Sequence, residues 1–207
     1  SLSDSNVEQI TVDIAVVNDA PTLDLTSADA TYVENDPPVS VLTDVTIEDE
    51  DSSLIDTVTI EILNADNGSD EILDVTDIVG ITSTYNAANQ TLTLQNDGSA
   101  TITDFETVIN SLTYENTSDI PGIDSRDIEI TVTDDGGAES LSEVVRVYLD
   151  DRSDSPIVNL DTGGANQPDY EDASYTEGYA AALAVGTVSI TDADSTHLTS
   201  LRIVINN

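Results

Sequence analysis

The chain has 207 residues, of which 42 are acidic and 4 are basic, so its formal charge at pH 7 is −38. All four basic residues are Arg, and the absence of Lys and Cys excludes Schiff-base chemistry, disulfides and thiolate metal sites. So few cations cannot neutralise a phosphate backbone, which excludes a nucleic-acid binder. No apolar run approaches the roughly 18 residues of a membrane-spanning helix, so we expect no membrane insertion.

Alternation of apolar and polar residues dominates the chain and predicts half-buried β-strands. Thr, Val and Ile fill these runs, which cover residues 9–16, 57–63, 90–94, 126–132 and 143–149. Clusters of Asp, Asn and Gly separate the runs and predict turns at residues 64–68, 96–98 and 134–137. Many short strands with such turns are typical of an antiparallel β-sandwich.

One segment has the period of a helix. Thr103–Glu106 is a capping-box pattern, and apolar residues follow at helical spacing, namely Phe105, Val108, Ile109 and Leu112. The spacing predicts a short helix of two turns that closes one end of the sandwich, with Phe105 as its largest buried side chain.

The sequence repeats itself. Three pairs of segments match in order: Asn18–Pro21 with Ser153–Pro156, Tyr32–Glu34 with Tyr175–Glu177, and Asp49–Ser52 with Asp192–Ser195. Pro cannot continue a β-ladder, so the boundaries between modules are expected at the proline residues. We therefore predict the terminal strand of a preceding module at 1–18, a complete module at 19–154 and the opening part of a following module at 155–207.

Acidic residues recur at matching positions of the two repeats, and hard cations such as Ca²⁺ prefer such oxygen ligands. The pattern is not an EF-hand, because a loop starting at Asp49 would place Ile60 where the bidentate Glu belongs. The turn Asp134–Gly137 occurs once, so the chain is not a calcium-roll array either. Distant acids could form a cation site only where the fold brings module ends together.

The segments Phe105–Asp119 and Arg126–Gly137, followed by a strand with an Asx-Pro exit, resemble the cadherin-like repeats of large bacterial surface adhesins. Asn18–Pro21 is similar to the junction between such repeats. Chondroitin-proteoglycan-type repeats share much of this pattern and are a neighbouring alternative. The resemblance implies an all-β fold of tandem antiparallel Greek-key β-sandwich modules with one short helix, and Ca²⁺ bound between successive modules.

The resemblance also implies two sets of calcium ligands. At the first junction these are Asn18, Asp19, Asp49, Asp51 and Asp134. At the second junction they are Glu34, Glu115, Asp150, Asp154, Asp192 and Asp194. Glu177 corresponds to Glu34 in the following module. Arg152 departs from the family pattern, and we expect that the second junction binds fewer ions or that Arg152 replaces an ion by pairing with carboxylates.

Other site chemistry has weak support in the sequence. His197 is the single histidine, and without a Gly-x-Ser-x-Gly motif it predicts a surface side chain rather than a catalytic relay, so we expect no enzyme. Five tyrosines could stack on sugars, although two of them are also expected in the core: Tyr85, Tyr114, Tyr170, Tyr175 and Tyr179. Three triplets match the N-glycan acceptor pattern: Asn67–Ser69, Asn89–Thr91 and Asn116–Ser118.

These observations predict a calcium-rigidified extracellular repeat of a cell-surface adhesin, stalk or matrix fibre. Its expected partners are neighbouring repeats of the same chain, and beyond them like chains in a fibre or surface glycans. Two alternatives stay open at this point: a carbohydrate- or matrix-binding module, and a subunit of an extracellular filament assembled by strand exchange.

Overall fold

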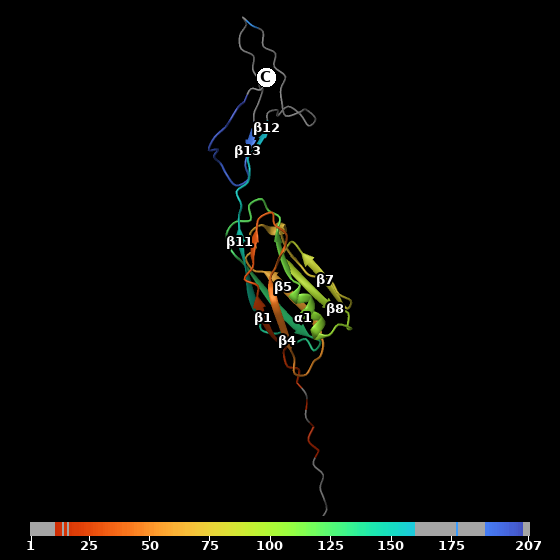
Figure 1. Ribbon diagram of the computed structural model, residues 1–207. Helices are drawn as coiled ribbons and strands as arrows, with labels where there is room; N and C mark the ends of the chain where they lie inside the picture. Colours follow the sequence, from red (N-terminus) through yellow and green to blue (C-terminus); the bar gives the residue numbers. More distant parts are fainter. Residues whose placement is uncertain (1–10, 14, 16, 160–176, 178–188, 205–207) are drawn as a thin grey trace, which may run out of the picture.

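The computed structural model describes residues 11–13, 15, 17–159, 177 and 189–204, and residues 22–150 form a β-sandwich (Figure 1). One layer is a six-stranded sheet in the order β2-β11-β10-β5-β8-β7, and the other consists of the pair β1-β4 and the sheet β3-β9-β6. The strands are β1 (Thr22–Ser27), β2 (Thr31–Val33), β3 (Val39–Ser40), β4 (Leu42–Glu48), β5 (Ile55–Ile62), β6 (Glu71–Asp74), β7 (Ile81–Asn86), β8 (Thr91–Asn96), β9 (Thr113–Asn116), β10 (Arg126–Asp134) and β11 (Glu143–Asp150). The all-β sandwich that the alternation predicted is therefore confirmed.

The pairings are antiparallel, apart from β2, which runs parallel to β11. Four of the five alternating runs form strands close to their predicted bounds, namely β5, β8, β10 and β11. The fifth run, 9–16, lies partly outside the described residues. Its described members, 11–13 and 15, are exposed and belong to no strand.

The core lies between the two layers and is built by the strand period. In β10 every second residue is buried, and Ile128, Ile130 and Val132 are fully enclosed. Tyr32 of β2 and Tyr114 of β9 meet edge to face, with ring centroids 5.7 Å apart and an interplanar angle of 84°. Both tyrosines are buried.

The predicted helix exists, although it begins earlier than expected. Helix α1 (Ile102–Asn110) packs against β4, and Phe105 is fully buried. The N-cap is Thr101, whose side chain forms a capping box with Asp104, rather than the predicted pair Thr103 and Glu106. The predicted box was wrong because Glu106 has another partner: its carboxylate accepts the backbone N–H of Ile47 at 2.9 Å.

The internal repeat reappears in the strand register. Strand β12 (Ile157–Asn159) pairs with β13 (Ser189–Thr191), and Ile157 lies opposite Thr191. In the sandwich, Thr22 lies opposite Glu48 at the corresponding positions of β1 and β4. Because most of residues 160–188 lie outside the described residues, the predicted module boundaries at 18 and 154 stay predictions.

A buried polar network closes the sandwich at the end where β10 begins. The Arg126 Nε atom lies 2.8 Å from Glu71 Oε2, and both side chains are almost completely buried. Glu71 also accepts the Tyr114 hydroxyl and the backbone N–H groups of Asp66 and Asn67. Every acceptor of this carboxylate is therefore engaged, and the network holds the 64–70 segment against the sandwich.

We predict that Arg126→Met lowers the free energy of unfolding by about 3–5 kcal/mol, because it leaves the buried Glu71 carboxylate without its cation. Urea denaturation followed by circular dichroism measures the change. Arg146→Met is the matched control, since Arg146 pairs with Asp127 at 2.7 Å on the surface and should matter little. Equal stability losses in the two variants would contradict the assignment.

Candidate metal centres at the two ends of the sandwich

The first cluster lies where the chain enters the sandwich and contains the five residues predicted for the first junction. The Asn18 side-chain amide donates to Asp134 Oδ2 at 2.8 Å. The backbone N–H of Asp19 donates to both carboxylate oxygens of Asp51, at 3.3 and 3.2 Å. Asp49 Oδ1 in turn accepts the backbone N–H of Asp51 at 3.1 Å. Residues more than a hundred positions apart thus meet at one end of the sandwich.

Local sequence explains why Asp134 reaches this cluster. It ends β10 and begins the turn Asp134–Gly137, in which Gly137 has the left-handed φ of 88°. Gly136 lies against the Asn18 side chain, and a Cβ atom there would overlap the Asn18 amide. The Gly-Gly pair therefore lets the chain turn and lets Asn18 approach Asp134.

The first cluster holds carboxylates in close proximity. Burial, together with the neighbouring Asp49 carboxylate, raises the pKa of Asp51. Burial alone would also raise the pKa of Asp134, but hydrogen bonds from the Ala138 backbone and the Asn18 side chain lower it. The Asp49 Oδ2 atom is buried without a hydrogen-bond partner. No described arginine pairs with an acid of this cluster, so nothing cationic offsets its charge.

The second cluster lies where the chain leaves the sandwich, and Glu34 is at its centre. Glu34 follows β2 and is completely buried. Its carboxylate accepts the backbone N–H of Arg152 at 2.8 Å and the Asn35 side chain at 3.2 Å. The Asp151 carboxylate lies beside it, with a buried Oδ1 atom that has no hydrogen-bond partner. Burial, followed by the nearby Asp151 and Asp154 carboxylates, raises the pKa of Glu34.

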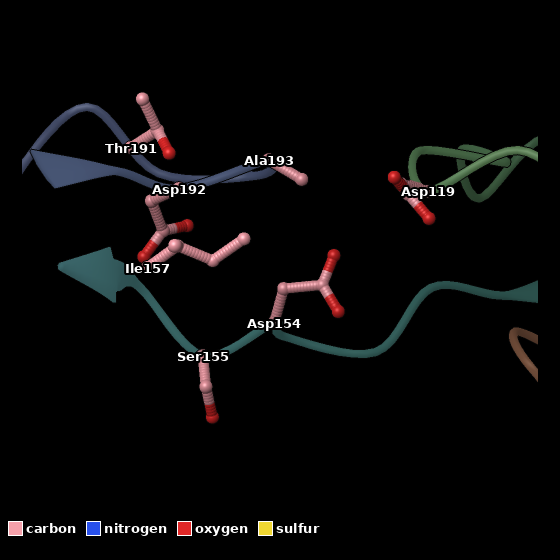
Figure 2. A pocket seen from close by; sticks show the side chains of 7 residues that line it. All are labelled: Asp119, Asp154, Ser155, Ile157, Thr191, Asp192 and Ala193. Carbon is pink, nitrogen blue, oxygen red and sulfur yellow. The ribbon is translucent and has the colours of Figure 1, made fainter. Parts of the chain in front are cut away.

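The second cluster continues into the β12-β13 hairpin. The backbone N–H of Asp154 donates to Asp194 Oδ2 at 3.2 Å. Asp192 and Asp194 lie side by side, which raises the pKa of Asp192 and lowers that of Asp194. Figure 2 shows the Asp154 side chain directed into a cleft of about 360 Å³ that Asp119 and Asp192 also line. Asp119 comes from the loop after β9, so residues of both the sandwich and the hairpin line this cleft.

The two clusters share one hydrogen-bonding scheme. Asp49 Oδ1 accepts the backbone N–H of Ser52 at 2.8 Å, and Asp192 Oδ1 accepts that of Ser195 at 3.0 Å. The contact of the Asp19 backbone with Asp51 corresponds to that of the Asp154 backbone with Asp194. The sequence repeat therefore specifies the same acidic geometry twice.

Two ligands predicted for the second junction, Asp150 and Glu115, do not place their carboxylates in its cluster, and the prediction for Glu177 in the following module stays a prediction. Asp150 has an exposed side chain, and only its backbone oxygen participates, accepting the Glu34 N–H at 3.0 Å. Glu115 is half-buried on β9 near the Tyr32 hydroxyl. Glu177 is exposed in a turn, and its neighbours in the chain lie outside the described residues.

Sequence reasoning missed Asp151 and Asp119. The alternation along β11 could have found Asp151, because Val145, Val147 and Leu149 are the buried positions and the next one inward is 151. Asp119 has no comparable signal, since it lies in a loop whose path depends on tertiary contacts.

Arg152 pairs with an acid, and the expectation that it replaces an ion stays a prediction. Its guanidinium nitrogens lie 3.1 and 3.4 Å from the two carboxylate oxygens of Asp36, close in sequence to Glu34. The second cluster therefore has one permanent cation at its edge, whereas the first has none among the described residues.

The candidate ligand side chains of the described residues do not surround one common point. Within the described ranges, no three acidic or histidine side chains form a group able to hold a metal ion. The donor chemistry nevertheless fits a hard cation, because carboxylate, amide and backbone oxygens dominate both clusters. The partnerless buried oxygens of Asp49 and Asp151 are acceptors that a cation would satisfy.

The described tyrosines and the single histidine give little support to a sugar-binding site or a catalytic relay. Tyr114 is buried, and the Tyr85 hydroxyl donates to the Glu71 backbone oxygen at 2.6 Å. Tyr170, Tyr175 and Tyr179, also considered for sugar stacking, lie outside the described residues. His197 is an exposed loop residue, as predicted, and its ring contacts Thr196.

Comparisons with known proteins give limited matches. No protein-family model matches the chain. In an alignment of 179 residues that covers 82% of this chain, the chain is 30% identical to Halomucin of Haloquadratum walsbyi, and it spans 2% of that protein. A solved structure, the protocadherin GammaB4 extracellular domain, is 16% identical with a TM-score of 0.29, covering 85% of this chain and 22% of that one. The described residues include no helix long and apolar enough to cross a membrane.

The buried Glu34 carboxylate predicts a specific pH dependence in calcium-free buffer. Its pKa is higher in the folded than in the unfolded protein, so its stabilising contribution is full below the ordinary value of 4.5 and is lost as the pH rises through the raised value. Wild-type stability relative to Glu34→Gln should therefore increase as the pH falls from 7 toward about 4.5. Urea denaturation across this range measures it.

Glu143→Gln is the matched control, because Glu143 is exposed at the start of β11. Parallel stability curves for wild type and Glu34→Gln would show that Glu34 is not a costly buried charge.

Proposed function

We propose that this chain is a repeat segment of an extracellular stalk, adhesin or matrix protein, and that Ca²⁺ bound at its junctions stiffens the array. The observation that carries the proposal is the repeated acidic scheme, in which Asp19 with Asp49 and Asp51 corresponds to Asp154 with Asp192 and Asp194. In both copies the contact joins the Asp two residues before the boundary proline to the second Asp of the Asp-x-Asp pair, more than 30 positions away. Solvated turn residues alone would not require such a long-range contact in both copies.

The residues of each cluster have separable roles. At the first junction, Asp49, Asp51 and Asp134 would hold the ion together with Asn18 and Asp19. At the second junction, Glu34, Asp151 and Asp154 would hold it from the sandwich side, and Asp192 and Asp194 from the hairpin side. A divalent cation would supply the positive charge that the described part of the first cluster lacks and that the second cluster has only at its edge, from Arg152.

Repulsion between carboxylates explains why the cation would change mechanics. Without a cation, like charges on the two sides of a junction favour separation, and the linker at Pro21 or Pro156 can swivel. With shared ligation, the same carboxylates favour one arrangement. Extracellular modules typically bind calcium with Kd of about 10⁻⁴–10⁻³ M, so the change would follow extracellular calcium.

Composition and similarity support the extracellular setting. A net charge of −38 suits a saline medium, in which repulsion is screened beyond about 8 Å. The relative Halomucin is a very long protein, since the match covers 82% of this chain but only 2% of that protein. The acidic segment Asp49–Ser52 recurs at Asp192–Ser195 of this chain, which favours a structural repeat over a catalyst.

Calcium should raise the stability of the chain. For a site with Kd of about 1 mM, about 10 mM calcium stabilises the folded state by about 1.4 kcal/mol per site. Thermal melting in calcium and in chelator measures the difference, and small-angle scattering should show a stiffer particle with calcium. Identical melting curves and scattering profiles in the two conditions would contradict the proposal.

Asp51→Asn should abolish the calcium response of the first junction, since it removes one charge while its amide oxygen still accepts the Asp19 N–H. Asp74→Asn is the matched control, because Asp74 is exposed at the end of β6, outside both clusters. An unchanged calcium response in Asp51→Asn would contradict the assignment of the first cluster.

Arg152→Asn should increase calcium binding at the second junction. The substitution releases the Asp36 carboxylate from its ion pair and removes the positive charge beside Glu34. Calorimetric titration should show tighter binding or an additional ion relative to wild type. Weaker binding would mean that Arg152 organises the cluster instead of competing with the cation.

A further inference from the structure

The fold distinguishes sharply between the three N-glycan acceptor triplets. Asn116 is buried, and its amide donates to Asn67 Oδ1 at 2.9 Å. The Asn67 amide donates to the Ser118 hydroxyl at 3.2 Å and the Ile120 backbone oxygen at 3.0 Å. Asn67 Oδ1 also accepts from Arg126 at 3.2 Å. Both amides thus belong to the network around Glu71, and a sugar on either would break it.

Asn89 has a different environment. It lies in the loop that joins β7 to β8, where Asn86 pairs with Thr91 and residues 87–90 form the tip. The tip is ordered by its neighbours, because Ala88 N–H donates to Asn86 Oδ1 at 3.0 Å and the Gln90 side chain donates to the Ala87 oxygen at 2.7 Å. The Asn89 side chain is exposed and makes no hydrogen bond with the described residues.

The strand order places this tip at the same end of the sandwich as the second junction, but on the edge of the sheet opposite β2 and β11. β8 begins opposite the end of β5, where Thr91 pairs with Glu61. β5 ends opposite the start of β10, and β10 starts opposite the last part of β11, which leads to Asp150. β7 is also the edge strand of its sheet, so no strand of the described residues pairs with its outer side.

We propose that Asn89 is an N-glycosylation site and that Asn67 and Asn116 are not modified in the folded protein. The co-substrate is a sugar linked through phosphate to a lipid. The Asn89 Nδ2 atom forms a bond to the anomeric carbon, the bond from that carbon to the phosphate oxygen breaks, and the phosphate leaves with the electron pair. The amide loses one proton, and no oxidant or reductant is required.

A sugar at Asn89 would cover the edge of β7 at the end of the sandwich from which the chain leaves. Exposed sheet edges can pair with other chains, and a bulky polar substituent prevents such pairing. The inference rests on the extracellular part of the proposed function, but not on calcium.

The test uses the folded chain with a purified oligosaccharyltransferase and its lipid-linked sugar donor. Chymotrypsin then releases the peptide 86–92, and mass spectrometry locates the sugar. We expect occupancy of Asn89 to exceed that of Asn67 and Asn116 by more than about tenfold, because the latter two require local unfolding. Asn89→Gln and Thr91→Ala should lose the modification, and Thr91→Ser should keep it.

Short synthetic peptides that carry each triplet separate sequence from accessibility, and we expect all three to accept the sugar. Modification of Asn67 or Asn116 in the folded chain to the level of Asn89 would overturn the inference. So would an unmodified Asn89, in the folded chain or in its peptide. Because calcium has no part in this readout, failure here leaves the calcium proposal intact, and failure of the calcium tests leaves this one intact.

Discussion

Carboxylates lie close to one another at both ends of the sandwich, and their mutual repulsion and burial cost free energy that other groups must offset. Glu34 is completely buried beside Asp151, yet the nearest arginine side chain pairs with Asp36 instead. Burying a charge without a counter-ion is expensive, so such an arrangement persists only where something compensates it. Backbone N–H groups compensate in part, as the Arg152 N–H does for Glu34. A divalent cation would complete the compensation.

The contrast with Glu71 makes the point clearer. Glu71 is equally buried, but Arg126, Tyr114 and two backbone N–H groups satisfy it from within the module. Glu71 therefore needs no further partner, and it stabilises the fold by holding these groups together. Glu34 lies where the chain leaves the sandwich, and its carboxylate neighbours are the acids Asp151 and Asp154. Position in the sandwich thus separates a carboxylate that is fully satisfied from one whose charge is only partly compensated.

Much of this architecture follows from the sequence. Alternating runs located β5, β8, β10 and β11, because burial of one sheet face imposes a period of two. The repeat of Asp49–Ser52 at Asp192–Ser195 indicated where the acidic scheme would recur. The start of α1 could not be fixed, since Thr101 and Thr103 both offer a cap and a tertiary contact of Glu106 decides between them. The alternation along β11 favours Asp151 over Asp150, because the buried positions Val145, Val147 and Leu149 continue inward to 151.

Anomalous diffraction from crystals grown in millimolar calcium tests the central claim most directly. We predict anomalous density between Asp49, Asp51 and Asp134 at one end, and among Glu34, Asp151, Asp154, Asp192 and Asp194 at the other. Maps without anomalous density at either end, with these side chains directed into bulk solvent, would contradict the account.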